Sequence, residues 1–550
     1  MTLAQYSRPS AEAGHEAAAS PAVAATSPWI NLAARLVAEK HECRKPCFVG
    51  PQGELSYAEL DREMRRAASA LTLLGARAGD RIFIALDDGF ELATIFYAGL
   101  AIGAIPVVFN PKLDARSSVE VLNDCAPVLA FCKPAYLDTL EAACWSTGGR
   151  TRALVAAPGE RGHIDWRPAE ADPNWRDFVY RDVEQTALIQ YTSGTTTGRP
   201  KGVAHSSRGA LAACEQLAAR RLGLTSEDVI YSVSKTFFGY GMGNSLFFPL
   251  YVGATAVLDP RWPTRETVME NLTRHCVTAL FAVPTVFRML LAADRPHCAL
   301  RLALSAGAPL SARIRSAWRA HFGLPVHDSI GATELFHIFA TTYPDSAAMD
   351  GLGGMVGDWR SVIVDADERV VAPGEIGVLL VQSSARALGY WSRSAETVQR
   401  FDDPRFGIGW FRTGDLFSQD ASGRLHFHGR EDDRFKVYGR WIIPGDIEAF
   451  VARHLPDLDE VVLAPGRGGD GELRPVLFLR AEGSSLDAAA ERVASLLRAN
   501  YDSYQCPALY LSFGGAPPLS SNGKLDRRAL SERANAAFAN EAGALVREGV

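Results

Sequence analysis

Long apolar runs are missing from this sequence of 550 residues, and no window approaches the roughly 18 unbroken apolar residues that a membrane-spanning helix needs. Polybasic segments are missing too, and a net charge of −6 gives no electrostatic footprint for nucleic acid. The nine cysteines are scattered, with only Cys43 and Cys47 close together, so neither a disulfide framework nor a cysteine-rich metal site is indicated. These absences predict a reduced, cytoplasmic protein without a membrane or nucleic-acid partner.

What is present is the composition of an ordinary globular protein, 47% hydrophobic and 22% charged. A chain of 550 residues is too long for one core and is expected to form at least two domains. Residues 1–27 are rich in Ala, Ser and Pro without a continuous apolar run, which predicts a disordered tail. The sequence does not indicate the oligomeric state, for which a homodimer is one option.

Helical and strand-like segments alternate along most of the chain, which is typical of layered α/β domains with largely parallel sheets. Helices are expected at 57–75 and 92–100, and buried strands at 81–86, 105–109, 128–132, 153–157, 254–258, 279–283 and 301–305. Two apolar runs at 361–365 and 377–381 flank Pro373-Gly374-Glu375, which predicts antiparallel strands. A final unit near 430 has strands expected at 460–464 and 475–480 and a helix at 486–500.

The strongest local signal is the segment Tyr191-Thr192-Ser193-Gly194-Thr195-Thr196-Thr197-Gly198-Arg199-Pro200-Lys201, which follows the apolar residues 187–189. Glycines let a backbone approach an anion closely, hydroxyls and amides donate to phosphate oxygens, and a lysine offsets their charge. The spacing differs from the common P-loop, because Lys201 does not directly follow a glycine. The segment therefore predicts a phosphate-binding loop of another kind.

The segment resembles the phosphate loop of the AMP-forming acyl-CoA synthetases, aryl-acid adenylating domains and luciferases. Four further motifs stand in the order expected for this adenylate-forming superfamily: Gly331-Ala332-Thr333-Glu334, Thr413-Gly414-Asp415, Gly429-Arg430-Glu431-Asp432 and Ser520-Ser521-Asn522-Gly523-Lys524. Taken singly, each could be an ordinary surface turn or ion-pair cluster. Together they cover nearly the whole chain from about residue 28 to 530.

The resemblance implies an ATP-dependent reaction in which a carboxylate oxygen attacks the α-phosphate and expels pyrophosphate. The acyl group of the resulting acyl-adenylate is then passed to a thiol, and AMP leaves. Lys524, Glu334 and Thr333 would be catalytic, with Glu334 also holding Mg²⁺ and Asp432 serving as the interdomain hinge. Nucleotide contacts would come from Thr192, Ser193, Gly194, Thr195, Thr196, Thr197, Gly198, Lys201, Ala306, Gly307, Ala308, Pro309, Asp328, Ile330, Gly331, Asp415 and Arg430. Asp415 and Arg430 would bind the ribose.

The same resemblance implies the fold and its division. A disordered tail at 1–27 would precede a large domain at 28–430, built of layered α/β subdomains and a β-barrel-like subdomain. A small mobile α+β domain at 431–540 would carry Lys524 and rotate about the hinge.

The aromatic, glycine-rich segment at 235–244 resembles the acyl pocket of benzoate–CoA ligases. The resemblance implies a flat slot lined by Phe238, Gly239, Tyr240, Gly241, Ser305, Gly331, His337 and Ile338. His337 would line the slot or donate to the carboxylate or a ring substituent. A histidine beside Phe and Ile is equally often a buried core residue whose hydrogen bonds are satisfied. Gly239 replaces an alanine of that subgroup, which suggests room for a substituent on the ring. An ortho- or meta-substituted benzoate, such as an amino- or hydroxybenzoate (anthranilate, for example), is therefore the expected acid.

The expected co-substrates are ATP with Mg²⁺ and coenzyme A. Three alternatives stay open: an aryl-acid adenylating enzyme that loads a phosphopantetheinyl carrier protein, a luciferase-type oxygenase, and a non-catalytic nucleotide-binding protein. Intact Lys201, Glu334, Asp415 and Lys524 argue against the last of these.

Overall fold

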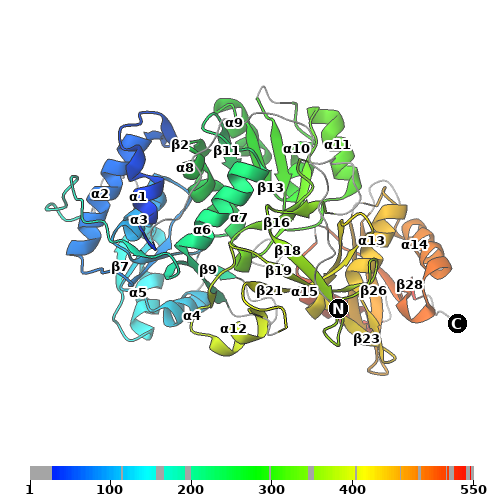
Figure 1. Cartoon of the computed structure of the whole chain (residues 1–550). Helices are drawn as coiled ribbons and strands as arrows, with labels where there is room; N and C mark the ends of the chain where they lie inside the picture. The colour runs from blue at the N-terminus through cyan, green and yellow to red at the C-terminus, as the bar shows by residue number, and fades with distance from the viewer. Residues whose placement is uncertain are drawn as a thin grey trace.

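The computed structural model describes residues 28–112, 115–156, 166–192, 200–295, 299–344, 352–402, 405–458, 460–480, 485–515, 517–518, 525–540 and 545–546. Several predicted residues lie outside these ranges: the tail at 1–27, Ser193, Gly194, Thr195, Thr196, Thr197, Gly198 and Lys524. Along the described chain, blue and cyan elements form one end of the molecule, green elements the middle, and orange and red elements the other end (Figure 1).

A seven-stranded sheet forms the first layer. Its order is β20 (Gly389–Tyr390), β10 (Lys201–Ser206), β9 (Thr186–Thr192), β5 (Ile105–Val108), β4 (Arg81–Ala85), β6 (Leu129–Cys132) and β7 (Arg152–Val155). The strands from β9 to β7 run parallel, whereas β10 and β20 are antiparallel additions at one edge. Its helices are α2 (Tyr57–Leu73), α3 (Phe90–Ala101), α4 (Ala115–Cys125) and α5 (Leu137–Ser146). Helix α2 starts at Tyr57 because Ser56 and Glu59 form a capping box.

A nine-stranded sheet forms the second layer. Its order is β17 (Gly354–Met355), β16 (Ile338–Thr341), β15 (His327–Gly331), β14 (Leu302–Ser305), β13 (Ala279–Ala282), β11 (Val229–Ser232), β12 (Thr255–Val257), β2 (Pro46–Gly50) and β3 (Gly53–Ser56). Six strands from β15 to β2 are parallel. Helices α9 (Arg265–Arg274), α10 (Pro284–Leu290) and α11 (Ala312–Phe322) belong to this layer. A short pair joins β1 (Trp29–Ile30) to β8 (Arg181–Asp182), and helix α1 (Leu32–Leu36) follows β1 in the chain.

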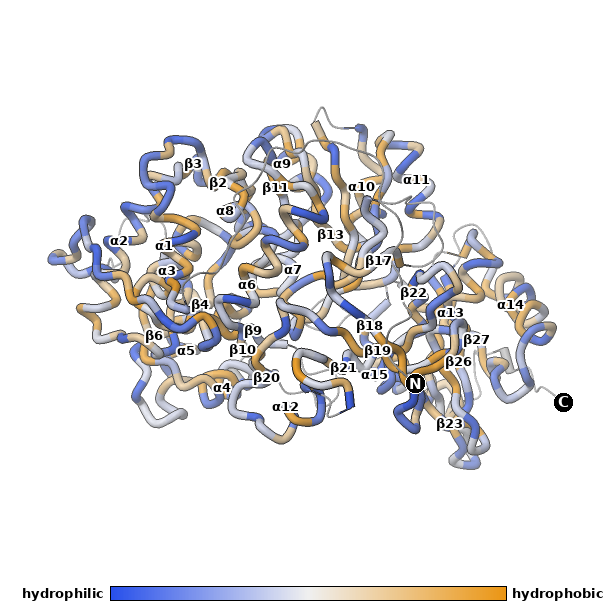
Figure 2. The backbone as a smooth tube through the Cα atoms, viewed as in Figure 1, coloured by the Kyte–Doolittle hydropathy of each residue, from blue (hydrophilic) through white to orange (hydrophobic). Residues whose placement is uncertain are grey.

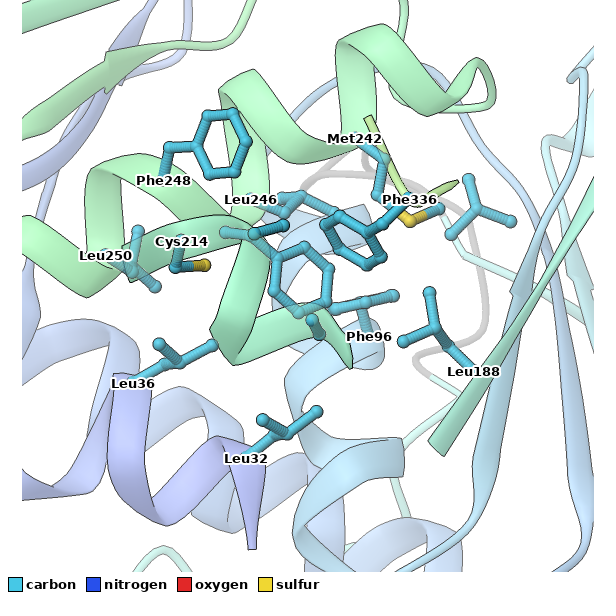
Figure 3. Packing of buried hydrophobic residues seen from close by; sticks show 14 of the residues in the cluster. Leu32, Leu36, Phe96, Leu188, Cys214, Met242, Leu246, Phe248, Leu250 and Phe336 are labelled. Atoms are coloured by element: carbon cyan, nitrogen blue, oxygen red, sulfur yellow. The ribbon is translucent and has the colours of Figure 1, made fainter. Parts of the chain in front are cut away.

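The largest buried cluster joins the two sheets. It includes Leu188 from β9 and Leu304 from β14, both fully buried. Between them run α6 (Ser207–Ala213), the π-helices η3 (Cys214–Arg221) and η4 (Gly243–Phe247), α7 (Gly239–Met242) and α8 (Phe248–Val252). Figure 3 shows Leu188, Met242, Leu246 and Phe336 converging in this core. Strand β9 thus turns Leu188 toward the second sheet, while Ile189 and Tyr191 pack in a cluster on the opposite face.

An antiparallel sheet follows, as the sequence predicted. Its order is β18 (Arg360–Val364), β19 (Gly377–Gln382), β21 (Trp410–Gln419) and β22 (Leu425–Arg430), with α12 (Ser394–Arg400) nearby in sequence. The predicted pairing of the two apolar runs is confirmed, since Ile363 lies opposite Leu379.

The last unit has its own buried core. It contains the hairpin β23 (Phe435–Val437) and β24 (Arg440–Ile442), the sheet β25 (Glu460–Arg467), β26 (Leu473–Arg480), β27 (Leu509–Ser512) and β28 (Leu545–Val546), and the helices α13 (Pro444–His454), α14 (Leu486–Asn500) and α15 (Arg527–Asn540). Two buried clusters consist entirely of its residues. The predicted helix at 486–500 is confirmed.

Hydrophobic stretches follow the central strands, whereas the outer ends of the helices and the tip beside β23 are hydrophilic (Figure 2). None of the helices in the described ranges combines the length and apolarity that crossing a membrane requires.

Candidate active site

The ends of the predicted phosphate loop are fixed by a β-hairpin. Thr192 at the end of β9 pairs with Lys201 at the start of β10. The Lys201 ammonium lies 2.6 Å from a carboxylate oxygen of Glu396 and 5.5 Å from the centre of the Tyr390 ring. The hydrogen bond from Lys201 lowers the pKa of Glu396, and Arg393 adds to the effect. The lysine is therefore held at the mouth of the loop by an anion and an aromatic face.

Tyr390 connects this lysine to the predicted metal-binding acid. Glu334 lies in η5 (Thr333–Leu335), directly after β15. The Tyr390 hydroxyl donates a hydrogen bond of 2.7 Å to Glu334 Oε1. Burial raises the pKa of Tyr390, and the nearby Glu334 raises it further, so the phenol remains a donor. Lys201 and Glu334, which lie far apart in the sequence, thus contact the same side chain: the lysine packs over the Tyr390 ring, and the carboxylate accepts from its hydroxyl.

Asp415 and Arg430 face each other across β21 and β22. The Arg430 guanidinium donates to Asp415 Oδ1 at 2.7 Å, and Asp415 is buried. Burial alone would lower the pKa of Arg430, but Asp415 and then Glu334 raise it above its ordinary value. The charge of Glu334 therefore adds to that of Asp415 in stabilising the Arg430 cation.

The predicted nucleotide contacts of this sheet lie beyond the carboxyl end of β14 and beside that end on β15, where Asp328 pairs with Ser305. This edge is where parallel α/β sheets bind their ligands. Residues 306–309 follow β14, and Gly307 adopts a φ of +91°, which favours glycine. Asp328 and Ile330 lie in β15. Burial raises the pKa of Asp328 to about 7, although Arg315 and the backbone amides of Leu310 and Ser329 counteract it.

The predicted acyl residues gather around Tyr240. Its hydroxyl donates to the Leu304 carbonyl at 2.8 Å, beside Ser305, and its ring centre lies 5.2 Å from that of His337. Gly331 pairs with Ile338 across β15 and β16. Gly241 packs so closely that a Cβ atom would lie 1.9 Å from the Lys235 carbonyl oxygen, so only glycine fits. Phe238, directly before α7, is half-buried against the same core.

His337 is oriented by the backbone. Its Nε2 lies 3.1 Å from the Tyr240 carbonyl oxygen, which can only accept, so Nε2 carries the proton and Nδ1 is left as an acceptor. Nδ1 is buried without a hydrogen-bond partner among the described residues. Burial lowers the pKa of His337 to about 3. This geometry favours an accepting role for Nδ1 over donation to a carboxylate.

The space beside Gly239 is not vacant. The position that a Cβ atom would take there lies 3.1 Å from Gln190 Oε1. The missing methyl group that suggested room for a ring substituent therefore makes room for the amide of Gln190, from β9 of the other sheet.

Comparison with known proteins identifies this arrangement. The model of the AMP-binding enzyme family matches residues 35–391. This chain belongs to the AMP-binding enzymes. The resemblance inferred from the motifs and the expected α/β architecture are both confirmed.

Two relatives and one solved structure illustrate where this AMP-binding enzyme lies in the family. It is 40% identical over 479 residues to the anthranilate–CoA ligase of Pseudomonas aeruginosa, covering 84% of this chain and 88% of that relative. It is 33% identical over 500 residues to the 4-hydroxybenzoate–CoA/benzoate–CoA ligase of Rhodopseudomonas palustris, covering 89% and 90%. The crystal structure of the anthranilate CoA ligase AuaEII in complex with anthranoyl-AMP matches with a TM-score of 0.83 and 26% identity, covering 94% of this chain and 99% of that one.

The residues of this AMP-binding enzyme fit a magnesium ion that arrives with ATP. Within the described ranges, no three His, Cys, Asp or Glu side chains converge on a metal position. Glu334, the predicted ligand, would supply one hard oxygen, and the Tyr390 hydroxyl donates to its carboxylate. Mg²⁺ commonly binds through one or two carboxylates, substrate phosphates and water. When bound, the ion would neutralise phosphate charge.

Sequence reasoning missed three residues of this site: Tyr390, Glu396 and Gln190. The last carried a signal, because a glutamine interrupts the otherwise apolar strand at 187–191.

A buried histidine beside the site makes stability depend on pH. His205 in β10 is fully buried, and neither ring nitrogen has a hydrogen-bond partner among the described residues. Burial lowers the pKa of His205 to about 3, below the ordinary 6.5. As the pH falls below 6.5, the unfolded chain binds a proton first, so the stability that neutral His205 permits is lost progressively between pH 6.5 and 3.

We therefore expect the free energy of unfolding of His205→Leu to fall less steeply as the pH is lowered below 6.5. The slope should decrease by up to about 1.4 kcal/mol per pH unit. His337 has a similarly lowered pKa, so the slope decreases without vanishing. Urea unfolding midpoints between pH 7.5 and 4.5 measure the effect. His41→Leu, at an exposed side chain, is the matched control. Equal slopes for His205→Leu and the parent would contradict the assignment.

Proposed function

We propose that this protein is an AMP-forming aryl-carboxylate:CoA ligase. It activates a benzoate-type acid carrying an amino or hydroxyl group, such as 2-aminobenzoate, with ATP and transfers the acyl group to coenzyme A. The observation that carries the proposal is that Lys201 and Glu334 both contact Tyr390, while the buried Asp415 pairs with Arg430. The names of the two aryl–CoA ligase relatives support the acid and the thiol.

The chemistry assigns a role to each group. A carboxylate oxygen attacks the α-phosphorus, a P–O bond forms, and the bond to pyrophosphate breaks. We propose that Lys201 and the hydroxyls of residues 192–197 orient the β- and γ-phosphates of the leaving group, with Glu334 holding the ion that accompanies them. Asp415 accepts from the ribose hydroxyls, and Thr333 contacts phosphate. Lys524, assigned on the motif around it, places a cation beside the attacking carboxylate and the α-phosphate.

The second half-reaction, in which the thiol of coenzyme A takes the acyl group and AMP leaves, requires the last unit to present a different face to the adenylate. We propose that residues 431–540 form a mobile domain that pivots near Asp432. Its separate buried clusters support independent movement. Arg527, which lies 3.2 Å from Asp433 and 2.7 Å from Glu448, ties the segment at 431–433 to this unit. We also propose a reducing, cytoplasmic setting, in line with eight free cysteines among the described residues.

ATP–pyrophosphate exchange over a panel of aromatic acids tests the proposal. We expect exchange with 2-aminobenzoate or hydroxybenzoates, no exchange with a short aliphatic acid, and a thioester once coenzyme A is added. Exchange without a coenzyme A thioester would favour a carrier protein as acceptor. A wide preference for plain benzoate would contradict the substituted ring, and failure with every aromatic acid would contradict the function.

A further inference from the structure

Gln190 is a buried amide in apolar surroundings. Its side chain is only 2% exposed, and Nε2 has no hydrogen-bond partner among the described residues. Its neighbours at the same register, Val108 on β5 and Val203 on β10, are fully buried valines of the inter-sheet core. A buried amide with an unmade hydrogen bond is costly to stability, and such groups are rare in folded proteins. Among the described residues, no hydrogen-bond partner of Nε2 offsets this cost.

The amide points toward the acyl residues. The would-be Cβ position of Gly239, directly before Tyr240, lies 3.1 Å from Gln190 Oε1 and 3.5 Å from Nε2. Any side chain at 239 would press on this amide. The two sheets therefore contribute to one site: β9 supplies the amide, and the segment after β11 supplies the glycine and the aromatic ring.

The position of Gln190 along β9 indicates which part of a substrate it meets. Side chains alternate along a strand, so Leu188, Gln190 and Thr192 share the face turned toward the second sheet. Two residues of a strand span about 7 Å, so Gln190 lies that far from Thr192, where the predicted phosphate loop begins. The reacting carboxylate of an acid has to reach the phosphates. A substituent ortho to the carboxylate lies beside that end of the ring, whereas a para substituent lies at the opposite end.

We infer that Gln190 is a specificity-determining residue whose amide hydrogen-bonds an amino or hydroxyl group ortho to the substrate carboxylate. An amide carries both a donor and an acceptor, so it serves either an amine or a phenol. The inference rests on the proposed aryl-acid function and deepens it. The inference explains Gln190 and Gly239 together, because the glycine leaves space for the amide that binds the ring substituent.

The test compares Gln190→Leu with the parent on 2-aminobenzoate, 2-hydroxybenzoate, 4-aminobenzoate and benzoate. We expect kcat/KM for the two ortho-substituted acids to fall roughly 10-fold, while benzoate and 4-aminobenzoate change less than about 3-fold. The melting temperature should stay level or rise, since leucine removes an unpaired polar group. Gln185→Leu, an exposed glutamine on the same stretch of chain, is the matched control and should change neither quantity.

Gly239→Ala provides a second variant that keeps the amide but displaces it. We expect the same loss of preference for ortho-substituted acids. An equal fall for all four acids would overturn the inference, because the amide would then serve the shared carboxylate. Loss of the 4-aminobenzoate activity alone, or a clear drop in melting temperature for Gln190→Leu, would also overturn it. If the parent exchanges with no aromatic acid, the proposed function fails instead.

Discussion

Glu334→Gln is expected to lower the rate of ATP–pyrophosphate exchange by on the order of 10²–10³-fold. The substitution keeps the size of the side chain and leaves an oxygen that can still accept from the Tyr390 hydroxyl, now 2.7 Å from the carboxylate. What disappears is the negative charge that we propose holds Mg²⁺. The fall should therefore be steepest at low Mg²⁺ and partly recovered at high Mg²⁺.

Two variants separate this effect from a structural one. Tyr390→Phe removes the hydroxyl but keeps the ring beside Lys201, and we expect a smaller loss of about 10-fold through a less well oriented carboxylate. Glu266→Gln, at a side chain that is 71% exposed, should leave exchange unchanged. A Glu334→Gln enzyme with the Mg²⁺ dependence of the parent would exclude Glu334 as the ligand.

Asp415→Ala is expected to reduce kcat/KM for ATP by roughly 10²–10⁴-fold. We propose that Asp415 accepts hydrogen bonds from both ribose hydroxyls, and each hydrogen bond to a charged group contributes about 1.5–3 kcal/mol. The loss should fall on ATP binding more than on folding. The Arg430 side chain is 39% exposed, so water can solvate its cation once Asp415 is gone. The melting temperature should consequently shift by only a few degrees.

Deoxynucleotides give the sharper measurement. The parent should discriminate strongly against 2′-deoxy-ATP and 3′-deoxy-ATP, and Asp415→Ala should lose that discrimination. Asp138→Ala, at an exposed carboxylate in the first turn of α5, is the matched control. If Asp415→Ala still prefers ATP over both deoxynucleotides, then the carboxylate does not read the ribose.

The sequence predicted the architecture well where the pattern was strong. Buried parallel strands are continuous apolar runs, so those near 81–86 and 279–283 were found within one or two residues. The family followed from five motifs in order, because each keeps residue types that the chemistry demands. The last unit was also anticipated, down to the bounds of α14.

The partners of the motif residues were not predictable in the same way. Tyr390 meets Glu334 and Lys201 only because β20 pairs with β10 at the sheet edge, and that pairing leaves no local periodicity in the sequence. Gln190 is recognisable in the sequence as a polar residue in an apolar strand. Its proposed role, however, depends on contact with Gly239, which follows a strand of the other sheet. Contacts of this kind need the tertiary structure.

Lys201 is paired with an anion of its own chain. Its ammonium lies 2.6 Å from Glu396, so the phosphate that we propose it binds would exchange one anion for another. The free energy gained by ATP at this position is therefore the difference between two ion pairs rather than the full value of one. The same carboxylate lies close by when pyrophosphate leaves, so re-forming the Lys201–Glu396 ion pair would favour release of the product. If Lys201 binds phosphate as we propose, Glu396 lowers its affinity for substrate and product alike, which suits an enzyme that must release pyrophosphate in every turnover.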